Sequence, residues 1–389
     1  MNKDRPDHQS IAFAGTKGQG MYDWLTGPAA AIWLDRGVDR QRGGYYDSLS
    51  MGDAKNSSEF KRLRVTCRQI FVFSRLSTLG VSGAQDAMEH GINFLFDKLR
   101  HSEGGFVRSV TIDGQKLDER RDLYDLAFTV FALAAAFGRT RDTNLRDEAL
   151  RILTFIQTQL WHEAGGYQEG LPPALPRRQN PHMHLLEACL AWLPLSAESA
   201  FRDVAQTILD LMSARFWSSD SECLFEYFED DWQPCTNIDR RIFEPGHHFE
   251  WAWLLGECAN AGLVVPDLSE KLARKAFQHG FSAQGLPYAE VRPDGSVADE
   301  FCRIWVITEW LRAQSTHCAD FVPETRSEPG SAPLDKLQHF LNVPTKGLWF
   351  ERCNAVSGQF VNEAVPASSL YHIVTGIDHL LELPQNYTH

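Results

Sequence analysis

The amino-acid sequence predicts an all-α fold, a six-hairpin α-toroid with short β-hairpins in its connections. A turn followed by an aromatic or apolar residue recurs six times along the 389 residues, first as Gly43-Gly44-Tyr45. The six markers begin at residues 43, 104, 165, 224, 285 and 347, so the successive steps are 61, 61, 59, 61 and 62 residues. Helical patterns flank each marker, and stretches with strand-like alternation are short. Repeats of this length indicate stacked supersecondary units that bury one continuous core.

Hydrophobic periodicity predicts twelve helices in six pairs. The helices that precede the markers are predicted at roughly 19–35, 84–100, 142–161, 198–216, 266–281 and 332–342. The helices that follow the markers are predicted at roughly 61–80, 122–138, 181–195, 246–261, 300–313 and 367–384. We expect residues 1–15 to form a flexible tail and residues 16–389 a single domain, with 314–333 as a surface connection within it.

Composition excludes several classes of protein. Hydrophobic residues make up 43% of the chain, which is ample for a large core and too apolar for disorder. The formal net charge of −13, without a basic cluster, argues against nucleic acid and anionic membranes as partners. The eight cysteines stand singly, no apolar signal core follows Met1, and no stretch of about 18 apolar residues could span a bilayer. We therefore expect a cytoplasmic protein, either a monomer or a homodimer.

The stretch from Pro245 to Leu255 is the most informative part of the sequence. Pro and Gly end the preceding segment and an apolar run begins a helix, so His247 and Glu250 lie on one face of its first turn. The partial positive charge at a helix N-terminus disfavours imidazolium, which predicts a neutral His247 that can accept a proton. The alternative is a capped core helix whose histidine is only hydrogen-bonded.

Chemically useful side chains recur early in each helix of the second set. They are Arg68, Tyr124, His184, His247 with Glu250, Trp305 with Glu309, and His372. With Glu309 counted for the fifth repeat, the steps are 56, 60, 63, 62 and 63 residues. If the six hairpins close into a toroid with these helices inside, the side chains meet at one mouth of a central funnel. A water-filled pocket is the expected place for them, because burying polar groups without partners is costly.

Two alternatives to a shared pocket are open. Each polar group could be satisfied within its own helix layer. The histidines could also bind a metal ion, but this is not favoured, because His182 with His184 and His247 with His248 do not share a helix face.

Four motifs follow one another across nearly the whole chain. They are Asn180-x-x-x-His184-x-x-Glu187, Pro245-Gly246-His247-x-x-Glu250-x-x-Trp253-Leu254-Leu255, Trp305-x-x-x-Glu309 and Tyr371-His372. Together they resemble the N-acylglucosamine 2-epimerase superfamily and, within it, the mannose isomerase branch. The resemblance implies an (α/α)6 barrel that isomerises or epimerises a monosaccharide without a cofactor or a metal ion.

The resemblance also implies roles for individual residues. His247 and His372 are expected to be the acid/base pair. Substrate-contacting or histidine-orienting roles are implied for Arg68, Tyr124, Asn180, His184, Glu250, Trp253, Trp305 and Glu309. The residue types suit this chemistry, since an imidazole can take the proton from C2 of an open-chain aldose and a guanidinium can stabilise the enediolate. Glu250 and Glu309 are expected to fix the tautomers of the two histidines.

Two departures from the family pattern bear on the reaction. Thr375 stands where the epimerase branches usually carry an arginine, and Arg64 stands where a tryptophan is common. We expect conversion of D-mannose to D-fructose, with a 2-epimerase of N-acyl-D-glucosamine or of free glucose and mannose as the alternative. Outside the family, an inverting glycoside hydrolase would need two carboxylates across the sugar ring, and a helical scaffold would carry a varied binding surface.

Overall fold

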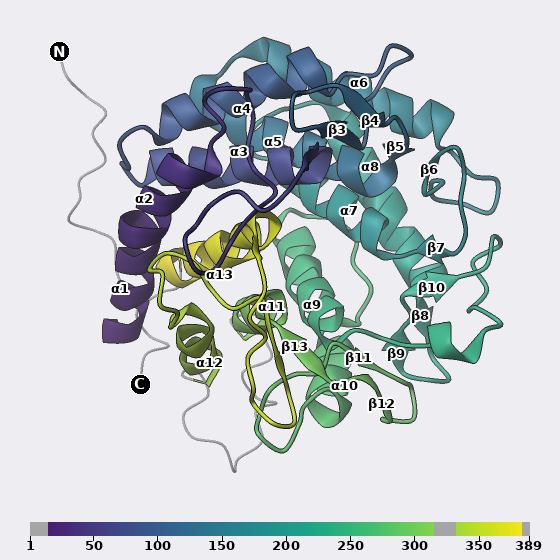
Figure 1. The fold of residues 1–389 in the computed structure, drawn as a ribbon. Helices are drawn as coiled ribbons and strands as arrows, with labels where there is room; N and C mark the ends of the chain where they lie inside the picture. The colour runs from purple at the N-terminus through teal and green to yellow at the C-terminus, as the bar shows by residue number, and fades with distance from the viewer. Residues whose placement is uncertain (1–14, 315–331, 383–389) are drawn as a thin grey trace.

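The computed structural model describes residues 15–314 and 332–382, which form an (α/α)6 barrel (Figure 1). The chain runs once round the ring, so that its first helix lies beside its last helices. Of the predicted tail only Gly15 is described, at the start of the first helix. Most of the predicted 314–333 connection lies outside the described residues.

Six helices form the inner wall of the barrel. They are α3 (Leu63–Thr78), α5 (Leu123–Thr140), α7 (Asn180–Trp192), α9 (Pro245–Asn260), α11 (Ile304–Ala313) and α13 (Leu370–Glu382). Each inner helix contacts the next one, and α13 contacts α3, so the ring is closed. These helices coincide with the second predicted set, with boundaries that differ by up to four residues.

The outer wall follows the first predicted set. Its helices are α1 (Gly15–Trp24) with α2 (Ala30–Ile32), α4 (Ala84–Lys98), α6 (Thr143–Gln159), α8 (Ser199–Leu211), α10 (Ser269–His279) and α12 (Ala332–Leu341). From α4 onward, each outer helix packs on the inner helix that precedes it in the chain, and α1 packs on α13. The predicted helix over 19–35 is interrupted by two π-helical turns, of which Leu25–Ala29 contains Pro28. Proline lacks the N–H that a regular helical turn needs, which explains the first interruption.

Short antiparallel strands connect the repeats near the starts of the inner helices. Three pairs are local hairpins, namely β3 (Ser109–Thr111) with β4 (Lys116–Asp118), β8 (Trp217–Ser218) with β9 (Cys223–Leu224), and β11 (Glu290–Val291) with β12 (Val297–Asp299). Five pairs join different repeats, namely β2 (Phe60–Arg62) with β3, β5 (Arg121–Asp122) with β6 (Gly170–Leu171), β7 (Arg177–Arg178) with β10 (Tyr227–Phe228), β13 (Phe301–Arg303) with β14 (Arg352–Asn354), and β1 (Ser48–Leu49) with β15 (Val365–Pro366). The pairing of β1 with β15 joins the first and sixth repeats, so the strands close the ring as the helices do. Only the local hairpins were expected from the sequence.

One described helix, α5, is long and apolar enough to cross a membrane by length and composition alone. The expectation that no such stretch exists therefore does not hold for α5. In the barrel, 72% of this helix is buried, and it packs between α3, α6 and α7. Its apolar character is accounted for by its place in the inner ring.

Candidate active site

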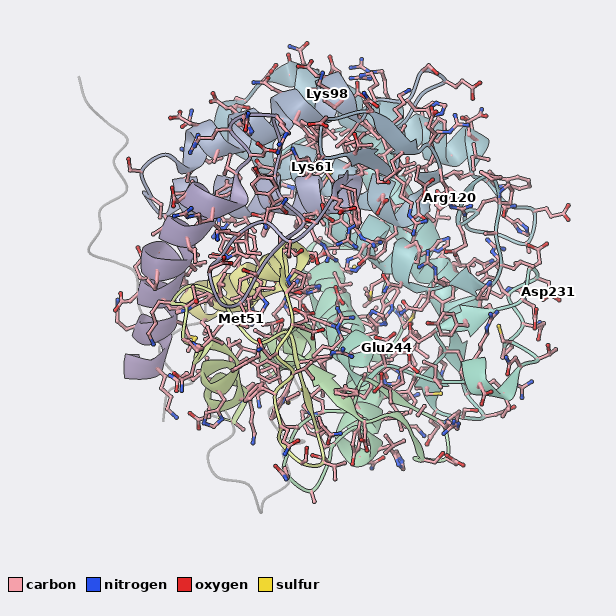
Figure 2. All side chains as sticks on the ribbon, viewed as in Figure 1. Met51, Lys61, Lys98, Arg120, Asp231 and Glu244 are labelled. Atoms are coloured by element: carbon pink, nitrogen blue, oxygen red, sulfur yellow. The ribbon has the colours of Figure 1, made fainter. Side chains whose placement is uncertain are left out.

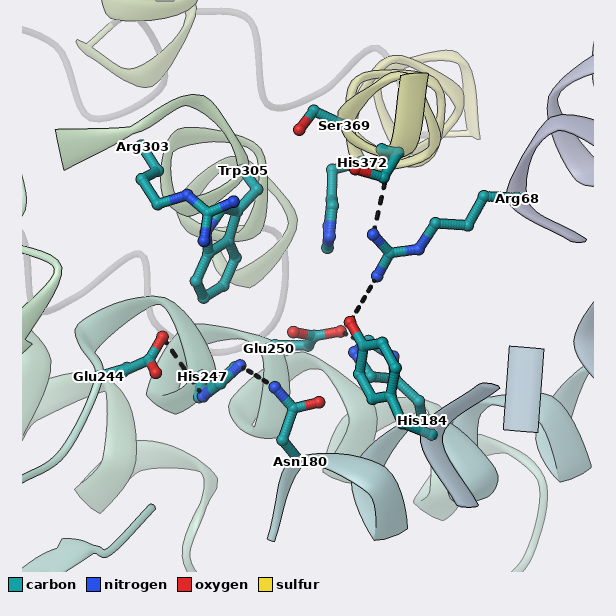
Figure 3. A pocket seen from close by; sticks show the side chains of 12 residues that line it. Arg68, Asn180, His184, Glu244, His247, Glu250, Arg303, Trp305, Ser369 and His372 are labelled. Carbon is teal, nitrogen blue, oxygen red and sulfur yellow. Dashed lines mark hydrogen bonds and ion pairs between the residues drawn. The ribbon is translucent and has the colours of Figure 1, made fainter. Parts of the chain in front are cut away.

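The first turns of the inner helices open into one cavity of about 140 Å³ (Figure 3). The cavity is lined by Arg68, Tyr124, Asn180, His184, Glu244, His247, Glu250, Arg303, Trp305, Ser368, Ser369 and His372. All six inner helices contribute to the lining, so their N-terminal ends meet at one mouth. Eight of the ten predicted site residues face this cavity, and Trp253 and Glu309 do not line it. The volume far exceeds the roughly 10–15 Å³ that a single water needs.

His247 is the third residue of α9, whose first position is taken by Pro245. Its Nδ1 lies 2.9 Å from Glu226 Oε2, and its Nε2 lies 3.0 Å from Asn180 Nδ2. Asn180 Oδ1 has no partner, so with the amide turned over this oxygen would accept from a protonated Nε2. Glu244 lies 3.6 Å from Nδ1. Figure 2 shows Glu244 toward the centre of the ring, whereas Asp231, earlier in the same connection, lies at its edge.

The electrostatics of His247 differ from the sequence prediction. Burial alone would lower the pKa of His247, but Glu226 and Glu244 outweigh burial and raise it to about 10. This pKa favours an imidazolium over the predicted neutral imidazole, because two carboxylates within 4 Å exceed the influence of a helix N-terminus, which is worth about 0.3–1 kcal/mol. The predicted orienting residue is also wrong, since Glu226 rather than Glu250 holds the Nδ1 of His247.

His372 is the third residue of α13 and lines the same cavity, beside Trp305. The Trp305 ring lies 5.0 Å from the His247 ring and 5.6 Å from the His372 ring, measured between centroids. His372 Nδ1 lies 2.8 Å from Glu309 Oε1, so the carboxylate that was expected to orient this histidine does contact it. Burial, together with the positive charge of Arg68, lowers the pKa of His372 well below its usual value. A neutral imidazole with its proton on Nδ1 presents the lone pair of Nε2 to the cavity.

Arg68 supplies a positive charge to the cavity wall. One Nη donates to the Tyr124 hydroxyl at 2.8 Å and the other to the Ser368 carbonyl at 3.3 Å, and the guanidinium lies 4.1 Å from the centre of the Phe128 ring. Tyr124 is fixed in turn because Asp122 caps the start of α5. Over the described part of the chain, no carboxylate lies within ion-pair distance of Arg68. Its charge is therefore available to an anionic oxygen on a bound molecule.

His184 and Glu250 form the floor of the cavity. His184 Nδ1 lies 3.2 Å from Glu187 Oε2 and 3.7 Å from Glu250 Oε1. Burial lowers the pKa of His184 to about 4, although the bond to Glu187 opposes the shift, so this imidazole is neutral near pH 7. Both oxygens of Glu250 are buried without a hydrogen-bond partner. Burial and the charges of Glu309 and Glu187 raise the pKa of Glu250 well above its usual value, which favours the neutral carboxylic acid.

Trp253 was expected to contact the substrate, but its ring lies outside the cavity. Its face packs against the guanidinium of Arg312, whose central carbon lies 3.6 Å from the ring centroid. Trp253 is three positions after Glu250, so the two side chains share a helix face, and only Glu250 reaches the cavity. The structure therefore corrects this assignment.

Two groups of side chains have the ligand types of a metal site, His184 with Glu187 and Glu250, and His247 with Glu226 and Glu244. In the first group, Arg312 donates to one oxygen of Glu187 and Tyr371 donates to the other. In the second group, Gln179 donates to the Glu226 oxygen that His247 also contacts. Internal partners therefore hold Glu187 and Glu226, and the buried cation Arg312 opposes a metal ion at the first group.

Sequence reasoning missed several residues around the cavity. They are Glu226, Glu244, Arg303, Arg312, Ser368 and Ser369, together with Glu187, which stands in a motif above but was given no role. A repeat signal could have identified Glu226, since an acid stands two residues after Tyr45, Tyr167, Leu224 and Trp349. In three repeats this acid binds an arginine that precedes an inner helix, in the pairs Asp47 with Arg62, Glu169 with Arg178, and Glu351 with Arg303. In the fourth repeat the acid binds His247 instead.

The fold and the residues at its mouth define an (α/α)6-barrel enzyme that acts on sugars, as comparison with known proteins shows. The profile of the family N-acylglucosamine 2-epimerase (GlcNAc 2-epimerase) matches residues 43–376, so the chain belongs to this family of sugar isomerases and epimerases. It is 34% identical to a mannose-6-phosphate isomerase of Rhizobium meliloti, over 92% of this chain and 95% of that protein. It is 25% identical to a D-mannose isomerase of Pseudomonas cannabina pv. alisalensis, over 68% and 71% of the two chains. The structure of cellobiose 2-epimerase from Bacillus thermoamylovorans superposes with a TM-score of 0.84 at 20% identity, covering 94% of this chain and 99% of that one.

Proposed function

We propose that this sugar isomerase converts free D-mannose to D-fructose by proton transfer between C2 and C1 of the open-chain sugar, with no cofactor. The observation that carries the proposal is the opposite shift of two histidine pKa values in one cavity. The pKa of His247 is raised to about 10 by Glu226 and Glu244 against the effect of burial, whereas burial and Arg68 lower that of His372. Groups whose environments push their pKa values apart are suited to act as acid and base.

In the proposed reaction His372 is the base. Its Nε2 takes the proton from C2, and the electron pair of the C2–H bond forms the C1–C2 double bond of a cis-enediolate. The negative charge that develops on oxygen is stabilised by Arg68 and by the cationic His247, which donates its proton to O1. His372 then returns its proton to C1, while O2 gives a proton back to His247 as the ketone forms. Both histidines end in their starting states.

The charges at the cavity favour a free sugar over a sugar phosphate. Two guanidinium groups line the cavity, and that of Arg303 is bonded to Glu351 at 3.1 Å. Arg68, the other one, is assigned to the enediolate. Glu244 and Glu250 also line the cavity, and a phosphate dianion is usually bound by several unpaired cations or N–H donors. The name of the Rhizobium meliloti relative makes mannose 6-phosphate the competing substrate to be measured.

The second candidate function is 2-epimerisation, of N-acyl-D-glucosamine or of free glucose and mannose. It is favoured by one observation, namely that His247 and His372 line the same cavity, each beside the Trp305 ring, so a protonated His247 could deliver its proton to the other face of C2. NMR of D-mannose, mannose 6-phosphate and N-acetyl-D-glucosamine incubated with the purified protein in D₂O separates these functions. The proposal expects fructose from D-mannose as the first product. If an epimer forms without fructose, the protein is a 2-epimerase and the proposed isomerase activity is rejected. If only mannose 6-phosphate is converted, the proposed substrate, free D-mannose, is rejected.

We also propose that the protein works in the cytoplasm, as a monomer or a homodimer, without nucleic acid or a membrane as partner. Seven cysteines in the described part of the chain are all buried and none is in a disulfide, which suits a reducing compartment.

A further inference from the structure

Arg312 lies behind the cavity, on α11, one turn after Glu309. Its side chain is 2% exposed. One Nη donates to Glu309 Oε2 at 2.7 Å and the other donates to Glu187 Oε1 at 3.2 Å. The face of its guanidinium rests on Trp253, 3.6 Å from the ring centroid. Arg312 does not line the cavity, so it acts on the chemistry only through other side chains.

The two carboxylates that Arg312 binds are the partners of two cavity histidines. The second oxygen of Glu309 contacts His372 Nδ1 at 2.8 Å. The second oxygen of Glu187 contacts His184 Nδ1 at 3.2 Å and also accepts from the Tyr371 hydroxyl. Each carboxylate thus uses one oxygen for Arg312 and the other for a histidine. A single buried guanidinium therefore holds the acceptors behind both imidazoles.

We propose that Arg312 is a positioning residue that keeps Glu309 ionised and thereby keeps the Nε2 of His372 free of a proton. This inference rests on the proposed function, in which His372 Nε2 is the base.

The physical reason is a contest between burial and charge at Glu309. Burial and the charge of Glu187 raise the pKa of Glu309, whereas the charge and hydrogen bond of Arg312 lower it and so limit a rise that remains upward overall. Burial and the charges of Glu309 and Glu187 likewise raise the pKa of Glu250. These three carboxyl groups therefore all lie near Arg312, whose charge opposes the rise in the pKa of Glu309 and Glu250. If the cation were removed, the pKa of Glu309 would rise further, and a protonated Glu309 would donate to His372 Nδ1. The imidazole proton would then reside on Nε2, which could no longer accept a proton from C2.

Trp253 has a defined place in this arrangement. A guanidinium that stacks on an aromatic face keeps its plane, and the plane of Arg312 sets which carboxylate each Nη reaches. Trp253 therefore supports the cation instead of contacting the sugar.

The test is the pH dependence of turnover in Arg312→Gln, which keeps a hydrogen-bond donor and removes the charge. General-base catalysis is typically worth about 10²–10⁴-fold, so we expect kcat at pH 7 to fall by about 100-fold while KM changes little. The acid limb of the kcat profile should move up by about one pH unit or more, since Glu309 must lose a proton before His372 can act. Arg312→Lys, which keeps the charge, should restore the position of the acid limb and part of kcat.

The matched control is Arg75→Gln. Arg75 also joins two inner helices through a carboxylate, Asp378, but does not line the catalytic cavity. The Arg75→Gln substitution is expected to lower the melting temperature without moving the pH profile of kcat. If the profile of Arg312→Gln superimposes on that of the wild type after scaling, Arg312 has only a structural role and the inference is overturned. If Arg312→Gln does not fold, Arg312→Met serves as the second uncharged variant under the same criterion.

A measurement that needs no turnover separates this inference from the proposed function. In ¹⁵N-histidine-labelled protein at pH 7, His372 should carry its proton on Nδ1 in the wild type and on Nε2 in Arg312→Gln. The same tautomer in both proteins would overturn the inference, even if the wild type isomerises mannose. A wild type that converts none of the tested sugars would overturn the proposed function while leaving the tautomer result valid.

Discussion

Glu226 gives the most informative perturbation of the proposed acid, because it is the nearest carboxylate to His247. The substitution Glu226→Gln removes a charge 2.9 Å from Nδ1 and keeps the shape of the side chain. With an effective dielectric constant of about 20, two unit charges at this distance interact by roughly 6 kcal/mol, which equals about four pKa units. The pKa of His247, now raised to about 10 by Glu226 and Glu244 against burial, is then expected to fall to about 6.

The assay is the pH profile of kcat for mannose isomerisation. An acid works only while it is protonated, so activity is present below its pKa and is lost above it. In the wild type the alkaline limb assigned to His247 should lie near pH 10, and in Glu226→Gln it should move to about pH 6. At pH 8 the variant should therefore retain about 1% of the wild-type kcat, and near pH 5 it should recover much of the difference.

Glu169→Gln is the matched control, because Glu169 occupies the equivalent position in the third repeat and binds Arg178 instead of a histidine. Its alkaline limb should stay where the wild type has it. An alkaline limb that is unchanged in Glu226→Gln would refute the assignment of His247 as a carboxylate-stabilised acid.

Two further predictions concern Glu250 and Glu309, and Trp305, whose ring lies beside both histidines. Because the raised pKa of Glu250 favours its neutral form, Glu250→Gln should keep kcat within about tenfold of the wild type. Glu309→Gln should lower kcat by about 100-fold, because Glu309 contacts His372 Nδ1. Equal losses of kcat in the two variants in steady-state assays would contradict these protonation states. Gly246→Ala places a Cβ 2.5 Å from the Trp305 ring, so the ring must move. We expect a lower kcat with little loss of helical circular dichroism. An unchanged kcat would contradict the packing role of Trp305.

The helices and most of the cavity lining could be predicted from the sequence because both repeat with the period of the fold. A step of about 61 residues places Arg68, His184, His247 and His372 at equivalent points of their helices, and the closed ring then brings them together. Periodicity could not predict the pairing of strands from different repeats. Those strands are two or three residues long, and their partners are fixed by the closure of the barrel, not by local pattern.

The charge states of the site were beyond the sequence for a different reason. Glu226 lies 21 positions before His247, on a separate strand connection, and no helical spacing relates the two. The sequence shows the helix N-terminus but not these contacts, so it predicts the protonation of His247 from the helix N-terminus alone. The stronger influence came from carboxylates whose distances only the folded chain defines.

The same reasoning explains the position of Trp253. Helical spacing puts its side chain on the face of α9 that carries Glu250, but spacing does not say how deep that face extends into the barrel. Arg312, from the neighbouring α11, fills the space beneath the cavity and covers the ring.

The central claim is that His372 takes the proton from C2 of mannose, and the exchange of that proton measures it most directly. D-mannose is incubated in D₂O with the wild type and with His372→Gln, and the C2 hydrogen and the fructose signals are followed by NMR. We expect the wild type to produce fructose, and we expect His372→Gln to lose about 10²–10⁴-fold in both C2 hydrogen loss and fructose formation. Loss of the C2 hydrogen at the wild-type rate in His372→Gln would contradict the account.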